Sequence, residues 1–301
     1  MRIGQIISRG VVAAQAAMIG ALYVFLLQAP VQVLSAIAQG EGMAAPGQQP
    51  DATRLMFNLS LSCGTFVLSV VVFLLFPLVQ GGILGRVRDH LKLPRLLPGP
   101  FAVYARAFYS RLLGSQALFA LLMFAVMVPV MGLFVGSAFQ EMAQARSSEL
   151  AEGAPAAQPP DPQHLTRHLL SQPAVLVAMG ALSLLLSAVG MVYWVANCIV
   201  VSEEERVVAS WRHSLRFCRQ NLPAVAAVWL VNVVAGLLIS PIGLIGVLGV
   251  VKEPWVLVAV ALVYSAVIGC WSVLLAGLVM SLYLAGRSPA EQREPETSAM
   301  A

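Results

Sequence analysis

The sequence has few charged residues. Only 11% of its 301 residues are Asp, Glu, Lys or Arg, whereas 59% are hydrophobic, and the mean hydropathy is +0.82. A soluble domain is about 25% charged, and a single protein core stops growing near roughly 250–300 residues. A soluble chain of this length could not bury so much apolar surface. The composition therefore excludes an ordinary globular protein and indicates that most of the chain lies in a bilayer.

Cysteine is also scarce, and the familiar catalytic motifs are missing. The four cysteines, Cys63, Cys198, Cys218 and Cys270, lie far apart with no CxxC spacing, so the sequence predicts neither a disulfide framework nor a zinc site. It contains no P-loop, dinucleotide fingerprint, GxSxG elbow or HExxH motif. We therefore expect no enzyme activity, no catalytic residues and no cofactor, with a membrane hydrolase as a remote alternative.

Six apolar runs are long enough to cross a bilayer, which takes about 20 residues at 1.5 Å rise per residue. None of them contains Asp, Glu, Lys, Arg or His. The sequence thus predicts an all-α transmembrane domain over residues 1–286 with spans at about 11–34, 59–80, 115–139, 173–201, 222–250 and 255–285. Residues 40–54 and 141–163 are predicted to be disordered connections, and residues 287–301 a disordered tail.

The basic residues follow the predicted topology. With the N-terminus inside, the inner segments hold fourteen Lys and Arg residues and the outer segments hold only Arg54, Arg146, Arg167 and Lys252. This asymmetry obeys the positive-inside rule. It predicts a multi-pass protein of a bacterial inner membrane with both termini cytoplasmic, and it argues against a nucleic-acid partner.

The first apolar run allows a second interpretation. Arg2 and Arg9 precede it, and residues 35–38 resemble the small-residue cleavage site of a secretory signal. A secretory signal has an apolar region of only about 7–15 residues, and this run is longer. We expect an uncleaved signal-anchor; cleavage would leave five spans.

The first inner connection has an amphipathic pattern. After Pro98-Gly99-Pro100, the apolar residues Phe101, Tyr104, Phe108 and Leu112 recur at helical spacing, with Arg106 and Arg111 off that stripe. The pattern predicts a cytoplasmic helix lying on the membrane, its aromatic side at the acyl boundary and its arginines at anionic headgroups.

The second inner connection is similar. Ser202 and Glu205 have the spacing of a capping box, and Glu203 and Glu204 would suit the positive end of a helix. The predicted apolar side holds Val207, Val208, Trp211, Leu215 and Cys218, and the basic side holds Arg212, Arg216 and Arg219. Such a helix either only fixes topology or is a site for anionic lipid or a partner. The residues expected to make such contacts are Arg106, Arg111, Trp211, Arg212, Arg216 and Arg219.

The second and third spans with their linker match the fourth and fifth with theirs, which is a weak internal repeat of the parallel type. The run from Glu203 to Asn221 also resembles a signature of poorly characterised bacterial polytopic membrane families, in which an acidic residue precedes a helix of the form Ala-Leu-basic-basic-Ser-x-basic-Leu-x-basic-Gly-Asn. One of these is the membrane domain found beside some glycerophosphodiester phosphodiesterases. Ser210 and Gln220 replace the usual alanine and glycine. The resemblance covers about residues 60–285 and implies a six-span membrane domain; it does not imply phosphodiesterase activity.

Other polar residues give weaker signals. His164 and His168 have the spacing of a two-His metal site, but beside a Pro-rich loop they fit a solvated helix start better. The polar residues inside the spans, including Asn197 and Asn232, are expected to form interhelical hydrogen bonds. A proton-driven carrier is disfavoured because intramembrane charges are missing.

Two functional hypotheses remain. One is a structural or accessory membrane component that contacts anionic lipid, a membrane-protein partner or a second copy of itself. The other is a transporter or lipid-translocating module built from the paired repeats.

Overall fold

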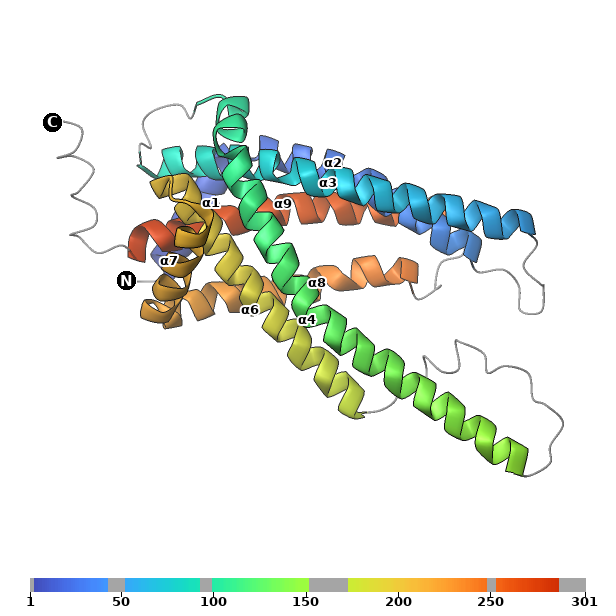
Figure 1. Ribbon diagram of the computed structural model, residues 1–301. Helices are drawn as coiled ribbons and strands as arrows, with labels where there is room; N and C mark the ends of the chain where they lie inside the picture. The colour runs from blue at the N-terminus through green and yellow to red at the C-terminus, as the bar shows by residue number, and fades with distance from the viewer. Residues whose placement is uncertain (1–2, 43–51, 93–98, 152–172, 248–252, 287–301) are drawn as a thin grey trace. The chain divides into compact units, whose positions relative to one another are not determined.

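The chain folds into helices. The computed structural model describes residues 3–42, 52–92, 99–151, 173–247 and 253–286, and these residues form eight helices and no strand (Figure 1). The helices are α1 (Ile3–Ala16), α2 (Ile19–Gly42), α3 (Ala52–Lys92), α4 (Phe101–Ala151), α6 (Pro173–Glu203), α7 (Val207–Gln220), α8 (Leu222–Val247) and α9 (Pro254–Gly286).

Six of these helices are long and apolar enough to cross a membrane. Their candidate spans are Ile19–Ile37, Leu59–Lys92, Phe101–Val130, Gly180–Glu203, Leu222–Ile242 and Trp255–Gly286. The predicted fold class, a helical bundle with six spans, is confirmed, and the protein is a multi-pass membrane protein. The predicted tail at 287–301 and the pair His164 and His168 lie outside the described residues.

The chain divides into two compact units. Unit 1 contains Met1–Gln116 and Met191–Ala301, and unit 2 contains Ala117–Gly190. Unit 2 presents large apolar side chains outward, among them Leu121, Phe124 and Leu185, which are 69%, 71% and 53% exposed. Unit 1 holds most of the buried core and all the residues discussed below.

The core of unit 1 forms around α9. Helices α1, α2, α3 and α8 all pack on α9, and α3 also packs on α1 and α2 (Figure 1). The small residues Ala13, Ala17 and Ala21 are buried in this core. Small side chains let helix backbones approach closely, which is how spans associate when no water drives them together.

The first span begins later than predicted. A turn at Ala17 and Met18 separates α1 from α2. Hydrogen bonds between residues three positions apart tighten this turn: Ala17 N–H donates to Ala14 O at 3.0 Å, and Gly20 N–H donates to Ala17 O at 2.7 Å. Residues 11–16 therefore belong to a separate helix. Hydropathy alone could not place this break, because the residues on both sides of it are apolar.

Other predicted boundaries also shift. Helix α8 continues through Pro241 to Val247. Parts of the predicted disordered connections are helical, since α2 reaches Gly42, α3 begins at Ala52 and α4 extends to Ala151.

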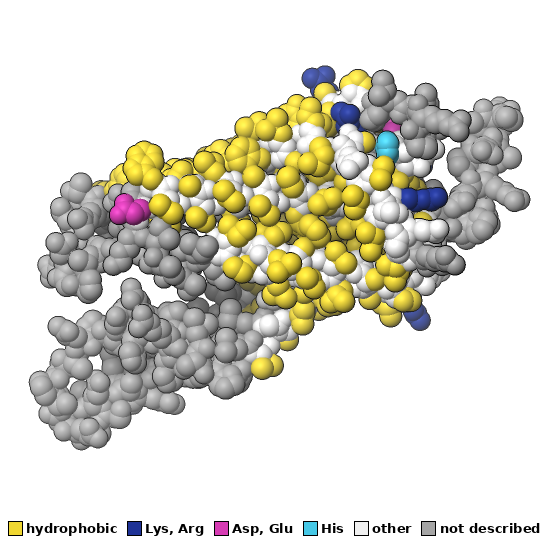
Figure 2. Space-filling model, turned by 180° about the vertical axis from the view of Figure 1, so that it is seen from behind, with side chains coloured by type: hydrophobic (Ala, Val, Ile, Leu, Met, Phe, Trp, Pro, Cys, Tyr) yellow, Lys and Arg dark blue, Asp and Glu magenta, His cyan; other side chains and the backbone are white. Residues whose placement is uncertain are grey.

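Figure 2 shows hydrophobic side chains over much of the visible surface and the Lys and Arg side chains gathered toward one end. We call that end of unit 1 the basic end.

Polar residues inside the spans form pairs. The Ser115 hydroxyl donates to Asn197 Oδ1 at 2.7 Å, and the Tyr193 hydroxyl donates to Gln80 Oε1 at 3.1 Å. Trp271 Nε1 donates to Asn232 Oδ1 at 3.0 Å. The prediction that Asn197 and Asn232 make interhelical hydrogen bonds is confirmed.

Candidate functional site

The end of α6 organises the basic end. Helix α6 stops at Glu203, and Glu204 has a φ of 56°, the left-handed region that non-glycine residues rarely adopt. The predicted capping box is wrong: Ser202 belongs to α6 and its hydroxyl contacts Met280 Sδ at 3.3 Å, while Arg206 is the N-cap of α7 and makes no side-chain cap bond. Glu203 and Glu204 therefore lie at the negative end of α6, not at the positive end of α7.

Two arginines offset this negative helix end. Arg88 Nη1 donates to the carbonyl of Val201 at 2.8 Å, and Arg111 Nη1 donates to the carbonyl of Glu204 at 2.6 Å. Cations at a helix C-terminus are stabilising because the last carbonyls carry partial negative charge. Arg88 is also paired with Asp89 at 3.0 Å. These arginines join the ends of α3 and α4 to the end of α6.

The aromatic stripe of the first inner connection lies in the core, not at the acyl boundary as predicted. Phe101 to Leu112 form the first turns of α4 rather than a separate helix, and Phe108 and Leu112 are 4% and 0% exposed. A Cβ on Gly82 would clash with the Phe101 ring, and one on Gly85 would clash with the Tyr104 side chain. The prediction failed because the glycines of α3 provide a groove that takes the rings.

Helix α7 rests on the bundle through a polar face. Ser210, Ser214 and Phe217 are buried, and the Ser214 hydroxyl donates to the carbonyl of Val192 at 2.7 Å. Trp211 Nε1 donates to Ser115 Oγ at 3.1 Å, which ties α7 to the start of α4. The predicted apolar side is thus divided, since Trp211 faces inward while Val208 and Leu215 are 59% and 56% exposed.

The outward side of α7 carries its arginines. Arg212, Arg216 and Arg219 are exposed, next to the exposed apolar residues Val208 and Leu215. Among the described residues, no carboxylate lies within 4.0 Å of these three guanidinium groups. Of the other predicted contact residues, Arg106 is exposed, whereas Arg111 is engaged by Glu204.

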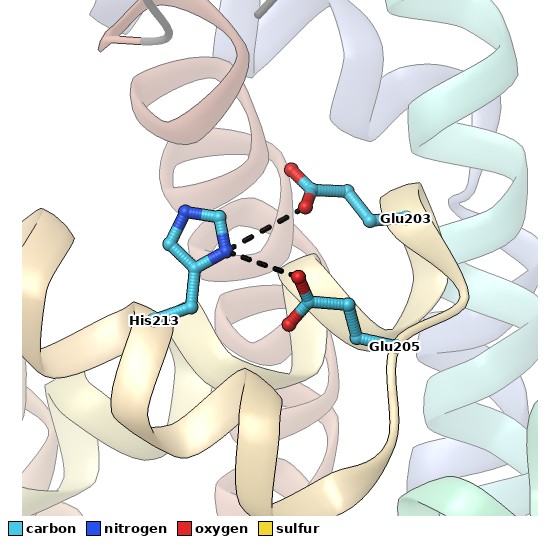
Figure 3. Close-up of side chains that lie close together, drawn as sticks. All are labelled: Glu203, Glu205 and His213. Atoms are coloured by element: carbon cyan, nitrogen blue, oxygen red, sulfur yellow. Dashed lines mark hydrogen bonds and ion pairs between the residues drawn. The ribbon is translucent and has the colours of Figure 1, made fainter.

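A group of titratable side chains lies where α6 meets α7 (Figure 3). His213 Nδ1 is 3.5 Å from Glu203 Oε2 and 3.4 Å from Glu205 Oε1. The Tyr283 hydroxyl of α9 donates to Glu203 Oε1, and the rings of Tyr283 and His213 lie edge to face at 6.3 Å. We call Glu203, Glu205 and His213 the turn cluster.

No pattern in the sequence predicts this cluster. Glu205 lies before the N-cap of α7, eight residues before His213, and Tyr283 comes seventy residues later. The chain reversal at Glu204 brings the three groups together, and a positive φ at glutamate is not readable from residue type. Burial raises the pKa of the Cys218 thiol, also on α7, and so disfavours its reactive thiolate form.

No protein-family model, curated protein or solved structure matches the chain.

Proposed function

We propose that this protein is a non-enzymatic, accessory or structural component of a bacterial inner membrane, with both termini cytoplasmic, that binds anionic lipid headgroups through α7. The observation that carries the proposal is the outward face of α7, where Arg212, Arg216 and Arg219 are exposed beside Val208 and Leu215. The proposal also takes up the resemblance of residues 203–221 to bacterial polytopic membrane families.

The geometry of α7 suits an interfacial helix. Viewed down the helix axis, the side chains follow one another in the order Leu215, Val208, Arg219, Arg212, Arg216. An apolar edge therefore lies directly beside a basic face. An interfacial helix places its apolar edge at the acyl boundary and its basic residues among the headgroups. Each basic residue near an anionic surface contributes about 1 kcal/mol.

The bundle fixes this face in place. Trp211 donates to Ser115, and Ser214 donates to the carbonyl of Val192, so the inward side of α7 is held by directional bonds. Because the helix cannot roll, its arginines keep one orientation without a lipid present. Such preorganisation lowers the entropic cost of binding a headgroup.

A transport role is the second candidate, and one observation favours it. Gln80 Nε2, Gln116 Oε1 and Asn197 Nδ2 are buried and have no hydrogen-bond partner among the described residues. Buried polar atoms are usually paired, so these three atoms could bind water or a polar solute between the spans. Uptake of a polar solute by proteoliposomes that contain the wild-type protein, and loss of that uptake in Asn197→Leu, would support transport over the accessory role.

The lipid proposal is tested with the full chain in nanodiscs of equal phosphatidylglycerol and phosphatidylcholine. Native mass spectrometry of the released protein counts the retained lipids. We expect wild type to retain an excess of phosphatidylglycerol, and the triple variant Arg212→Gln, Arg216→Gln, Arg219→Gln to lose that excess by at least about tenfold.

The matched control replaces the same three arginines with lysine, which keeps the charge. This variant should retain most of the phosphatidylglycerol, because attraction to a charged surface depends mainly on net charge. Equal phosphatidylglycerol retention by the glutamine variant and wild type would contradict the proposal.

A further inference from the structure

We propose that the turn cluster is a binding site for a divalent transition-metal ion of the Zn²⁺ class. One imidazole nitrogen and two carboxylate oxygens, from His213, Glu203 and Glu205, all lie within 4.8 Å of one another. Imidazole and carboxylate are both ordinary ligands of Zn²⁺. This inference goes beyond the lipid role of α7 and does not depend on it.

The two distances from His213 match those between ligands of one ion. His213 Nδ1 lies 3.5 Å from Glu203 Oε2 and 3.4 Å from Glu205 Oε1. A charge-assisted hydrogen bond would bring such atoms to about 2.7–2.9 Å. Four ligands around Zn²⁺ at about 2.0–2.2 Å are separated by about 3.3–3.6 Å along each edge of the tetrahedron. The observed separations fit a shared ion better than a direct bond.

The charges in the cluster also suit a dication. Two carboxylates approach one imidazole, which carries at most a single positive charge. A divalent ion neutralises both carboxylates and leaves the imidazole neutral, the form that binds metal. Arg111 pairs with Glu204, whose side chain is not in the cluster.

Surrounding groups hold the ligands in position. The Tyr283 hydroxyl donates to the second oxygen of Glu203, which leaves Oε2 facing His213. Hydrogen bonds of this kind from neighbouring groups orient metal ligands. Glu205 Oε2 is buried with no hydrogen-bond partner among the described residues, and a second carboxylate oxygen in that position can complete a bidentate ligand.

The backbone supports the same conclusion. Glu204 adopts a φ of 56° between the two ligating glutamates. Non-glycine residues held in this region are strained, and such strain concentrates at ligand sites. Here the strained residue reverses the chain so that Glu203 and Glu205 both face His213 (Figure 3).

The ligand set selects the class of ion. Mg²⁺ and Ca²⁺ prefer oxygen ligands throughout, whereas an imidazole nitrogen suits Zn²⁺ and its first-row neighbours. The three side chains are only 15–31% exposed, which leaves room for a water as fourth ligand. A bound ion would fasten α7 to the end of α6 and, through Tyr283, to α9.

The test titrates the chelator-treated full chain in detergent with Zn²⁺ by calorimetry, and with Co²⁺ by visible absorption. We expect wild type to bind one Zn²⁺ per chain and to give the intense absorption of four-coordinate Co²⁺. Glu205→Gln and His213→Gln should each bind Zn²⁺ at least about tenfold more weakly. The matched control Glu204→Gln removes the same charge one residue away and should bind as wild type does.

Three results would overturn the site. These are wild-type affinity no higher than that of Glu205→Gln, loss of binding in Glu204→Gln as large as in Glu205→Gln, and displacement of Zn²⁺ by equimolar Mg²⁺. Size-exclusion profiles show whether each variant is folded. Should His213→Gln fail to fold, the comparison of Glu205→Gln with Glu204→Gln and the wild-type Co²⁺ spectrum decide the question.

Discussion

At the scale of single residues, Gly277 of α9 faces Gly10 of α1 where the two helix backbones meet. A Cβ at Gly277 would clash with the Gly10 carbonyl oxygen, and a Cβ at Gly10 would lie 2.9 Å from Leu278 Cα. Both obstacles are backbone atoms, which cannot rotate away as a side chain can. The two glycines therefore set the distance between α1 and α9.

Gly277→Ala is expected to destabilise the protein, because the added methyl group forces α1 away from α9. The measurement is the midpoint of thermal unfolding of the purified chain in detergent. The matched control is Gly236→Ala in α8, where a Cβ would meet nothing within 4 Å. Alanine favours a helix over glycine by about 0.5–1 kcal/mol, so the control should raise the midpoint slightly. A midpoint that rises in both variants would contradict the proposed contact.

The arginines show how far residue type alone leads. The count of basic residues predicted the side of the membrane for each connection, but it treated Arg88 and Arg106 alike. In the structure Arg88 binds the carbonyl of Val201 and Asp89, whereas Arg106 is exposed. The difference depends on where α6 ends relative to Arg88, and that is a property of the tertiary structure. The same limit applies to Arg111, expected at lipid and found on Glu204.

At the scale of elements, α7 was predicted as a helix, but the side of it that packs on the bundle was not predicted correctly. An amphipathic pattern places polar residues such as serine on the outward face of a helix, yet Ser210 and Ser214 are buried. A serine hydroxyl can bond a backbone carbonyl, as Ser214 does with Val192 and Ser210 with Val207. Such bonds make a serine face a good packing surface in a bundle where apolar surfaces already face lipid.

The orientation of α7 predicts which of its positions contact lipid. A nitroxide at Leu215→Cys should be more accessible to oxygen, which partitions into the bilayer, than to a water-soluble nickel chelate. Ala209 is also exposed, but it lies about 120° around the helix at 100° per residue. A nitroxide at Ala209→Cys should show the reverse preference. The measurement is power-saturation electron paramagnetic resonance of the full chain in anionic liposomes. Equal exposure of both positions to the chelate would mean that α7 stands away from the bilayer.

The first span shows the corresponding limit for helix ends. Residues 11–34 read as one apolar run, yet α1 and α2 are separate helices joined at Ala17 and Met18. The break lets the buried side of α1, including Gly10, pack on α9. Packing decided this boundary, and packing has no signature in hydropathy.

At the scale of the whole molecule, the number of spans was the most predictable property. Six apolar runs without charge must form helices in lipid, because every backbone N–H and C=O group there needs a hydrogen-bond partner within the protein. What remained unpredictable is how the helices meet, since that depends on particular contacts such as Gly82 with the Phe101 ring. The turn cluster belongs to the same class, because it exists only once α6, α7 and α9 have met.

The proposed topology makes a sharp prediction about α8. Arg216 on α7 and Glu253 before α9 are both exposed, and only the span within α8 separates them along the chain. With both termini cytoplasmic, Glu253 must lie outside the cell membrane and Arg216 inside. The test places one cysteine at either position in a variant with the four native cysteines replaced.

A membrane-impermeant maleimide applied to intact spheroplasts should label Glu253→Cys at once and Arg216→Cys only after the membrane is permeabilised. The opposite pattern would mean that the whole chain is inverted, which would contradict the positive-inside assignment. Labelling of both positions from outside would mean that α8 does not cross, and the protein would then have an odd number of spans with its termini on opposite sides. The basic face of α7 can meet the anionic inner leaflet only if the first pattern is found, so this measurement also decides whether the lipid proposal is geometrically allowed.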